Sequence, residues 1–262
     1  MPEGDTISRA AFTLSRALAG KTVRRFRCAG ASASRAALAG RRIDSVAAAG
    51  KNLLVRFDDG RTLRTHMRMH GSWHLYRPGE RWRLPESLAR AVLETDDWTA
   101  VCFSAPVVEV LRPGEERSHP ALARLGPDVL GENFREDEAV SRLRARPDLE
   151  VGDALLRQDR IAGIGNIWKS ETLFRCRVDP FARVSTLSDA VLAKVVREAR
   201  KLMGRNSGEA YRPAKPTLAG TYAVYRRSGK PCRRCGTAIA MRRQGEEKRS
   251  TYFCPACQET AP

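Results

Sequence analysis

The chain has 262 residues, a hydrophobic content of 42% and a formal net charge of +17, with 47 Lys and Arg against 30 Asp and Glu. This length and composition predict two domains with real cores and a small appendage. The shortage of acidic residues favours a polyanionic partner, in the first place nucleic acid, although a GC-rich genome also raises the share of Arg. Because no apolar run approaches ~18 residues and no signal-peptide pattern appears, we expect a cytoplasmic protein that does not bind membranes.

The chain begins Met1-Pro2-Glu3-Gly4-Asp5. Removal of Met1 before a small residue would leave Pro2 with a free secondary amine. An α-amino group titrates near ~7.7–8.0, so that a useful fraction is uncharged at neutral pH and can act as a nucleophile. The neighbouring carboxyl of Glu3 can serve as its acid. Many proteins start with Met-Pro for no catalytic reason, so the dipeptide alone leaves both interpretations open.

The first 112 residues predict a two-layer antiparallel β-sandwich domain with an N-terminal helix. The apolar spacing indicates a helix over residues 5–19, ended by Gly20. Alternating short runs follow, and Asp-rich turns at 58–60 and 96–97 separate pairs of them. The expected strands lie at residues 23–26, 43–46, 53–57, 62–64, 91–93 and 100–103.

From Pro106 to Pro127 a polar, proline-punctuated stretch is typical of an interdomain connection. A helical domain is then predicted over residues 128–222. Its last part, residues 205–222, suggests a mobile loop that could cover a site. The expected helices lie at residues 136–146, 152–158, 166–175 and 188–203, the last capped by Thr186 or Ser188.

Two glycines precede a helix in Gly163-Ile164-Gly165-Asn166. Free amides at a helix N-terminus can hold a phosphate, assisted by the helix dipole and by the side chain of Asn166. No Gly-Lys-Ser/Thr follows, which excludes a P-loop. A tight turn between packed helices is the alternative.

The seven cysteines include two knuckles, Cys232-x2-Cys235 and Cys254-x2-Cys257, separated by 18 residues. This spacing predicts a zinc ribbon, in which four thiolates close a tetrahedral site and make the ion structural. A redox pair or unligated thiols would not need two knuckles. The odd cysteine count also indicates a reducing compartment.

The segment 223–262 forms a predicted zinc-finger hairpin with nine basic and three acidic residues. Such a small module buries little core, so the metal supplies folding energy while basic side chains face a partner. Arg249, near the expected hairpin tip, is a candidate DNA contact. A solvated turn arginine is the alternative.

Taken in order, these motifs resemble the formamidopyrimidine-DNA glycosylase and endonuclease VIII family of base-excision repair enzymes. The resemblance spans nearly the whole chain and includes Gly50-Lys51, the segment 66–71 and Glu171. It implies an α+β fold with a two-layer β-sandwich, a helical domain with a helix-two-turns-helix motif and a zinc finger. It also implies a bifunctional DNA glycosylase and abasic-site lyase.

The resemblance assigns roles to individual residues. Pro2 would attack the anomeric carbon of the damaged nucleotide and form an iminium after the base leaves, and Glu3 would act as the acid. Lys51 would contact the phosphate beside the lesion and assist catalysis, and Glu171 matches a family carboxylate near the active site and joins the catalytic group. An ordinary hairpin lysine and a helix-surface glutamate are the alternatives. Strand cleavage by β- and δ-elimination would follow, with one structural zinc ion and no redox cofactor.

A base inside a duplex must be flipped out before it can react, and the gap must be filled. The segment His66-Met67-Arg68-Met69-His70-Gly71 resembles the void-filling loop of the family. Met69 would be the apolar wedge, flanked by Arg68 and His70, because a flexible thioether chain adapts to stacked bases. A core position for Met69 is the alternative.

Three departures from the family pattern favour oxidised pyrimidines over 8-oxoguanine. Thr6 stands where many members carry a glutamate, and Asp159 lies near a position where the purine branch tends to carry a lysine. The segment 102–106 is more similar to endonuclease VIII than to the purine branch, whose Arg-Arg-Phe-Gly signature it lacks.

Two other functions stay open on the sequence. One is a purine-lesion or abasic-site lyase of the same family, and the other is a non-catalytic zinc protein that binds damaged DNA. The expected partner in every case is double-stranded DNA with damaged bases or abasic sites. No heptad stripe is visible, so we expect a monomer.

Overall fold

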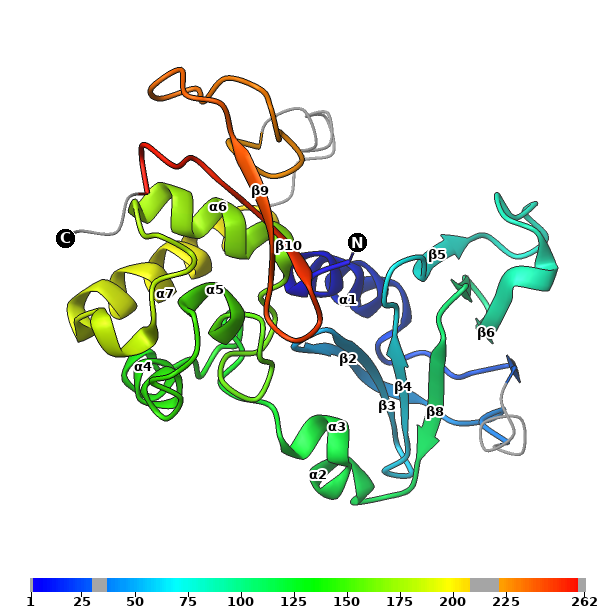
Figure 1. Ribbon diagram of the computed structural model, residues 1–262. Helices are drawn as coiled ribbons and strands as arrows, with labels where there is room; N and C mark the ends of the chain where they lie inside the picture. Colours follow the sequence, from blue (N-terminus) through cyan, green and yellow to red (C-terminus); the bar gives the residue numbers. More distant parts are fainter. Residues whose placement is uncertain (1, 30–36, 208–221, 259–262) are drawn as a thin grey trace. The chain divides into compact units, whose positions relative to one another are not determined.

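A computed structural model describes residues 2–29, 37–207 and 222–258. The chain divides into two compact units (Figure 1). We call residues 2–124 the sandwich unit, and residues 125–206 with 222–258 the helical unit. Within the described residues, no helix is long and apolar enough to cross a membrane.

Helix α1 (Gly4–Leu18) opens the sandwich unit. Its apolar face places Ile7, Leu14 and Leu18 in the core, where each is no more than 2% exposed. Gly20 follows with φ of +77°, the left-handed conformation that ends helices and that glycine adopts without strain. The predicted helix over 5–19 and its glycine stop are thus confirmed to within one residue.

Two antiparallel sheets of four strands form the sandwich. The order is β1-β6-β7-β5 in one sheet and β2-β3-β4-β8 in the other. A short 3₁₀ turn, Glu86–Leu88, leads into β6. The strands of the first sheet are β1 (Arg25–Cys28), β6 (Ala89–Glu94), β7 (Thr99–Phe103) and β5 (Ser72–Tyr76), and those of the second are β2 (Ile43–Ala49), β3 (Asn52–Phe57), β4 (Thr62–His66) and β8 (Val107–Leu111).

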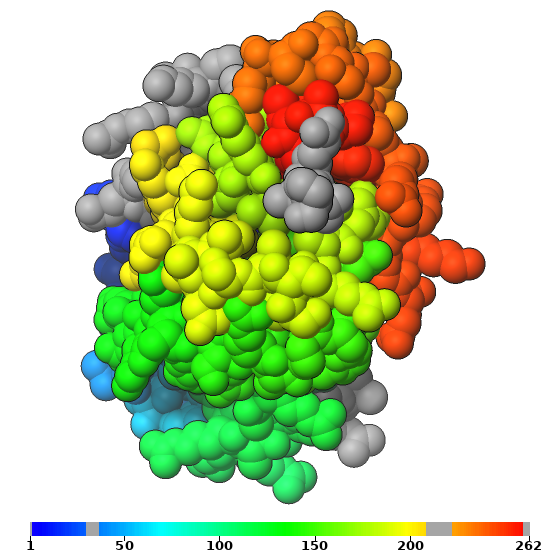
Figure 2. All heavy atoms as spheres, turned by 60° about the vertical axis from the view of Figure 1, so that its left-hand side comes forward, coloured from blue at the N-terminus to red at the C-terminus, as the bar shows by residue number. Residues whose placement is uncertain are grey.

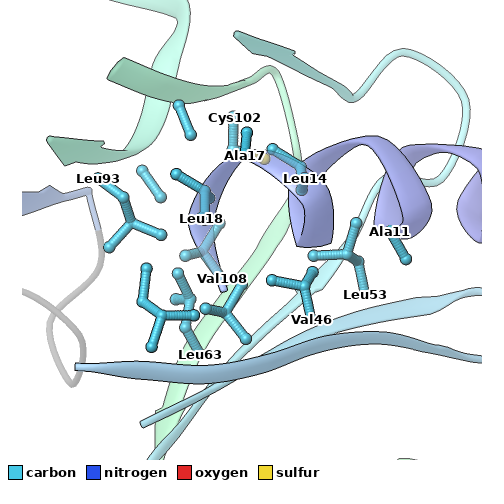
Figure 3. Packing of buried hydrophobic residues seen from close by; sticks show 14 of the residues in the cluster. Ala11, Leu14, Ala17, Leu18, Val46, Leu53, Leu63, Leu93, Cys102 and Val108 are labelled. Carbon is cyan, nitrogen blue, oxygen red and sulfur yellow. The ribbon is translucent and has the colours of Figure 1, made fainter. Parts of the chain in front are cut away.

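One hydrophobic core joins α1 to both sheets (Figure 3). Figure 3 shows α1 between the two layers, with Leu93 and Cys102 on one side and Val46, Leu53 and Leu63 on the other. Burial of these side chains supplies most of the stabilisation, at ~25 cal/mol per Å² of apolar surface. The predicted two-layer sandwich with an N-terminal helix is therefore confirmed.

The connection predicted between Pro106 and Pro127 was wrong in its first part. Residues Val107–Leu111 form strand β8, and two short helices follow, α2 (Glu115–Ser118) and α3 (Pro120–Ala123). The prolines mark the ends of these elements and do not mark a linker, since Pro120 occupies the first turn of α3, where a missing N–H costs nothing. Strand β5 was also missed.

The helical unit has four helices with one hydrophobic core. Ser188 caps the last of them, because its Oγ accepts a hydrogen bond from Val191 N at 3.3 Å. The second helix ends four residues before its predicted end, where the side chain of Gln158 instead donates to the carbonyls of Leu156 and Ile164. The helices are α4 (Glu136–Arg144), α5 (Val151–Ala154), α6 (Asn166–Cys176) and α7 (Asp189–Gly204), with a 3₁₀ turn at Val184–Thr186.

The cysteine module, residues 229–258, belongs to the same compact unit as these helices. Its hairpin consists of β9 (Ala240–Gln244) and β10 (Arg249–Phe253), and β10 packs on α6. Figure 2 shows the red and orange atoms of the module lying against the yellow-green atoms of the helices. Most of the loop predicted at 205–222 lies outside the described residues.

Candidate active site and nucleic-acid interface

The first candidate group lies at the start of α1. Pro2 is half-buried, and Glu3 is 1% exposed. The Glu3 carbonyl accepts the first helical hydrogen bond from Ile7 N at 3.0 Å, which fixes the backbone next to Pro2. The Glu3 carboxyl makes no capping hydrogen bond to α1 in the described chain. Its burial is therefore not explained by helix capping.

Lys51 lies in the tight turn between β2 and β3. Gly50 adopts φ of +58° there, a conformation that this turn requires and that glycine tolerates. Figure 3 shows Ala11, at the middle of α1, beside Leu53, while Leu18, at the end of the helix, lies toward Leu63. The start of α1 and the Gly50-Lys51 turn thus lie toward the same end of the sandwich unit.

The segment between β4 and β5 presents Met69 to solvent. Met67 is buried at 2% exposure and anchors the segment in the core, whereas Met69 is 53% exposed. Gly71 N donates to Met67 O at 2.9 Å, and a Cβ on Gly71 would come within 2.7 Å of the Met67 backbone. This close approach requires glycine. The alternative of a core position for Met69 is wrong, and its flanking residues Arg68 and His70 are exposed as well.

His66 is the first residue of the predicted void-filling segment, but the sequence assigned it no role of its own. It is paired with Asn52 across β3 and β4, and its Nδ1 accepts from Arg68 N at 3.3 Å. Burial, together with the positive charges of Arg64, Lys51 and Arg68, lowers the pKa of His66 to about 4. The ring is therefore neutral at pH 7 and close to the ammonium of Lys51.

This neutral His66 has a consequence for stability in acid. Its folded-state pKa lies below the ordinary 6.5, so between pH 6.5 and 4 the unfolded chain binds the proton that the folded chain rejects. Stability is thus lost as the pH falls through this window. We expect the free energy of unfolding, measured by urea titration, to fall less in His66→Gln than in the parent when the pH is lowered from 6.5 to 4. Equal losses in both proteins would contradict this account.

In the helical unit, Asn166 begins α6 and is buried. Its Nδ2 donates to Ser250 O on β10 at 2.6 Å, while its Oδ1 has no hydrogen-bond partner among the described residues. The side chain predicted to assist phosphate binding therefore ties α6 to the hairpin. Phosphate binding at the N-terminus of α6, where the helix dipole favours an anion, stays a prediction.

Lys169, which was not predicted, strengthens the same attachment. It is fully buried, and its Nζ donates to Thr251 Oγ1 at 2.6 Å. Thr251 in turn donates to Gln244 Oε1 at 2.8 Å on β9. This buried polar network fixes the hairpin on α6. The role of Lys169 can be recognised only from its contact with Thr251, and the sequence does not display that contact.

Glu171 accepts three backbone hydrogen bonds within the helical unit. Its Oε2 accepts from Ala223 N, and its Oε1 accepts from Val224 N and Tyr225 N, all at 2.9 Å. Both carboxylate oxygens are thus used to hold the segment that enters the cysteine module. This geometry favours a positioning role for Glu171, in place of the catalytic role that the resemblance implied.

We expect Glu171→Gln to destabilise the helical unit by about 2 kcal/mol, because an amide NH₂ would then face the N–H of Ala223. Hydrogen exchange at residues 223–225 should become faster. The matched control is Glu198→Gln, which removes an ion pair with Arg175 on the surface and should change stability by less than about 0.5 kcal/mol. Unchanged protection of the three amides would refute the role.

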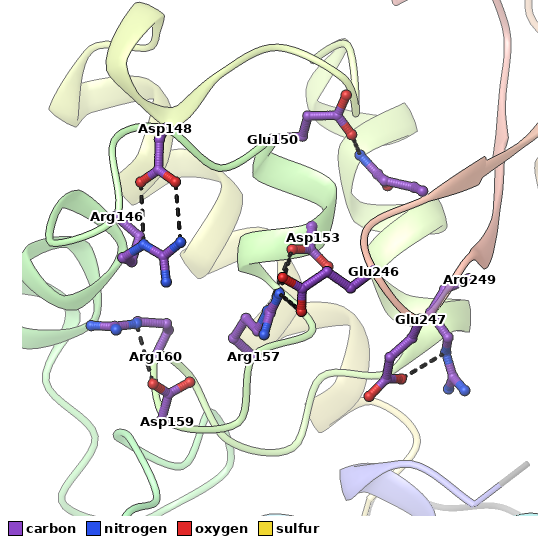
Figure 4. A network of polar contacts seen from close by, with 11 residues as sticks. Arg146, Asp148, Glu150, Asp153, Arg157, Asp159, Arg160, Glu246, Glu247 and Arg249 are labelled. Atoms are coloured by element: carbon purple, nitrogen blue, oxygen red, sulfur yellow. Dashed lines mark hydrogen bonds and ion pairs between the residues drawn. The ribbon is translucent and has the colours of Figure 1, made fainter.

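Arg249 stands at the start of β10, next to the hairpin tip. Figure 4 shows its guanidinium beside Glu247, with Nε 3.9 Å from a carboxylate oxygen. This pair is long and solvent-exposed, so it contributes little energy. Nearby, Arg157 is held by Asp153 and Glu246, which secures the other side of the tip (Figure 4).

The four clustered cysteines meet as predicted. The Sγ atoms of Cys232, Cys235, Cys254 and Cys257 all lie within 4.8 Å of one another. Three of the separations are 4.0, 3.5 and 3.4 Å, near the ~3.8 Å that tetrahedral Zn–S bonds of ~2.3 Å require. Gly236 N and Gln258 N donate to the carbonyls of Cys232 and Cys254, so both knuckles have the same turn. This donor set fits a metal ion with no open position.

A β-sandwich unit and a helical unit with a tetrathiolate module, both strongly basic, define a class of metal-binding proteins that act on nucleic acid. Comparison with known families identifies the class further. The model of the formamidopyrimidine-DNA glycosylase N-terminal domain matches residues 1–106, and that of its H2TH domain matches residues 125–208. A zinc finger found in FPG and IleRS matches residues 229–260.

Similar proteins span the whole chain. A probable endonuclease 8 2 of Streptomyces coelicolor is 40% identical, over 98% of this chain and 94% of that protein. The DNA-(apurinic or apyrimidinic site) lyase Nei2 of Mycolicibacterium smegmatis is 38% identical over 98% and 99%. Among solved structures, the MutM (Fpg) protein of Thermus thermophilus matches with a TM-score of 0.82 and 29% identity over all of both chains.

The chain therefore belongs to the formamidopyrimidine-DNA glycosylase and endonuclease VIII family of DNA-repair enzymes. It is an enzyme of the DNA glycosylase and abasic-site lyase class. The resemblance found in the sequence is thus confirmed at the level of family, fold and enzyme class.

Proposed function

We propose that this enzyme removes oxidised pyrimidines from double-stranded DNA and then cleaves the strand at the resulting abasic site. Pro2, once Met1 is removed, attacks the anomeric carbon, and the C–N bond to the damaged base breaks. The nitrogen lone pair then forms an iminium with the opened sugar, and Glu3 protonates the ring oxygen. The iminium acidifies the C2′ proton of the sugar, so that β-elimination breaks the C3′–O bond and releases the strand on the 3′ side. δ-elimination then breaks the C5′–O bond and releases the strand on the 5′ side with its phosphate.

The connection between β7 and β8 carries the pyrimidine preference in this proposal. It contains only Ser104, Ala105 and Pro106, and Ala105 is fully buried. Such a short turn offers no arginine to reach the base opposite the lesion. The exposed Met69, with Arg68 and His70, is left as the group that fills the gap when the damaged base is flipped out.

Binding to the DNA backbone is proposed for both units. In the sandwich unit, Lys51 contacts the phosphate beside the lesion as a point charge, near the neutral ring of His66. In the helical unit, the N-terminus of α6 at Asn166, with its helix dipole, and the guanidinium of Arg249 hold further phosphates. An abasic-site DNA complex of the Lactococcus lactis Fpg protein has the same fold, with a TM-score of 0.83 at 19% identity.

Zinc is the metal that we propose for the four cysteines, with a structural role and one ion per chain. We further propose that the enzyme acts in the cytoplasm as a monomer, since an enzyme that acts on one lesion at a time has no need of two-fold symmetry. Analytical ultracentrifugation at micromolar concentration gives the oligomeric state directly.

Base release from matched duplexes tests the substrate. We expect release from thymine glycol to be at least about tenfold faster than from 8-oxoguanine, with a borohydride-trapped adduct on both thymine glycol and an abasic site. The reverse ratio would establish the purine-lesion alternative. Trapping on the abasic site alone would reduce the enzyme to a lyase, and tight binding without any adduct would leave a non-catalytic zinc protein.

Met69 can be tested separately. We expect Met69→Ala to slow base release from thymine glycol by about tenfold, because the gap in the duplex is no longer filled. Strand cleavage at a preformed abasic site should change less, since no base has to be extruded there. Met241, the second exposed methionine among the described residues, provides the control, and Met241→Ala should leave both rates unchanged. Equal effects of the two substitutions would contradict the wedge.

A further inference from the structure

The turn that carries Lys51 is held by a buried side chain that directly follows it. Asn52 is only 4% exposed, and its Nδ2 donates to Ala49 O at 3.0 Å. This hydrogen bond spans Gly50 and Lys51 and reinforces the backbone pairing of Ala49 with Asn52 at the base of the turn. Asn52 also begins β3, so its backbone is held by the ladder to β4.

The amide oxygen of Asn52 is held by Arg64, a residue of β4. Arg64 Nε donates to Asn52 Oδ1 at 3.0 Å, which orients the amide with its NH₂ toward Ala49. Arg64 is itself 5% exposed, an unusual position for a guanidinium unless it is fully paired. Without Arg64, the amide of Asn52 could rotate and release the turn.

Two more residues continue the chain of contacts outward. Arg64 Nη1 donates to Glu109 Oε2 on β8 at 2.5 Å, and His119 Nε2 lies 3.3 Å from the same oxygen. His119 Nδ1 accepts from Ala121 N, so the neutral ring carries its proton on Nε2 and donates it to Glu109. Helix α3 and strand β8 are thereby linked to the Lys51 turn.

We propose that Asn52 and Arg64 are positioning residues that hold the ammonium of Lys51 in place for its contact with the lesion phosphate. This inference rests on the proposed function of Lys51. Neither residue touches DNA in the proposal, and neither takes part in proton transfer. Their role is to restrict the conformation of a glycine-containing turn, so that the lysine is positioned for one phosphate. A small displacement of the lysine ammonium would lower the rate by a large factor.

The test compares Asn52→Ala and Asn52→Asp with Lys51→Ala in single-turnover assays on an abasic-site duplex. We expect both Asn52 variants to lower the rate by about tenfold. The Asp side chain still accepts the hydrogen bond from Arg64, but it can no longer donate to Ala49 O. This variant therefore separates the effect of the hydrogen bond across the turn from the effect of leaving Arg64 Nε unpaired. Asn52→Asp with the parent rate would overturn the proposal.

A double-mutant cycle distinguishes positioning from general damage. In the Lys51→Ala background, Asn52→Ala should change the rate by less than about twofold, because the group that it positions is gone. The slope of log affinity against log salt should also fall by about one in Lys51→Ala and by up to that amount in Asn52→Ala. A tenfold rate loss in both backgrounds would overturn the proposal.

Arg56 provides the matched structural control. It lies on β3, and its guanidinium is paired with Glu116 through two hydrogen bonds at 2.9 and 2.5 Å. Within the described residues, no hydrogen bond joins its side chain to Asn52. Arg56→Met and Arg64→Met should both lower the melting temperature, and only Arg64→Met should lower the rate and the salt slope. If Lys51→Ala itself has the parent rate and slope, the proposed role of Lys51 fails, and this inference fails with it.

Discussion

Extending the chain by one residue before Pro2 should abolish the borohydride-trapped adduct on an abasic-site duplex. The added residue converts the amine of Pro2 into an amide, whose nitrogen lone pair is delocalised and cannot form an iminium. The fold should be kept, because α1 starts only at Gly4 and its core residues lie further along the chain. Intact-mass measurement of the parent should show that Met1 has been removed.

Glu3→Gln should separate the two steps of the same reaction. We expect base release to fall by about 10²-fold or more, because the amide cannot donate the proton that opens the sugar. Trapping on a preformed abasic site should persist, since the aldehyde there is already available to Pro2. Glu3 is 1% exposed, so circular dichroism and thermal unfolding are needed to show that the variant folds. Persistent adduct formation by the extended chain would exclude Pro2 as the nucleophile.

Removal of the metal should have the second large effect. The cysteine module contributes only Ile239, Cys232 and Cys254 to a small buried core, which it shares with Phe174 of α6 and with Val224. Structural zinc contributes about 10–16 kcal/mol in comparable modules, which is more than such a core can replace. We expect Cys232→Ala, or a strong chelator, to unfold residues 229–258. DNA binding should weaken by about tenfold or more, because Arg249 is then no longer positioned to contact a phosphate.

Metal content and hydrogen exchange measure this effect. The parent should contain one zinc ion per chain, and Cys232→Ala should contain none. Cys28→Ser is the control, since Cys28 is half-buried in the sandwich unit, outside the cluster, and its loss should leave the zinc content unchanged. Full zinc content in Cys232→Ala, or unchanged exchange in the hairpin, would show that the ion is not held by these four thiolates.

Sequence patterns predicted the parts of the fold that depend on local spacing. The helix of α1, the two cysteine knuckles and the turn at Asp58–Gly60 were all predicted, because apolar periodicity, metal-ligand spacing and turn chemistry are local properties. Strand β8 was missed because prolines stand on both sides of Val107–Leu111 and suggested a linker. Its pairing with β4 is a long-range contact that no local pattern displays.

The candidate site divides in the same way. Pro2, Glu3, Lys51 and Met69 were identified from short motifs, and the structure adds that Glu3 is buried and Met69 exposed. The carboxylate of Glu171 was placed in the catalytic group by resemblance, although three backbone amides more than 50 residues away occupy it. A motif records which residue type is present and does not record what that residue touches.

The sequence by itself determined the family, the four cysteines that cluster and the order of the units, because motif spacing and charge are visible without knowledge of contacts. Only the tertiary structure decided how these groups are held. Arg64 and Asn52 are 12 residues apart in the chain, and Lys169 and Thr251 are 82 apart, yet each pair shares a buried hydrogen bond. Buried polar groups must find partners wherever the fold brings them together, and the identity of those partners follows from packing between distant segments.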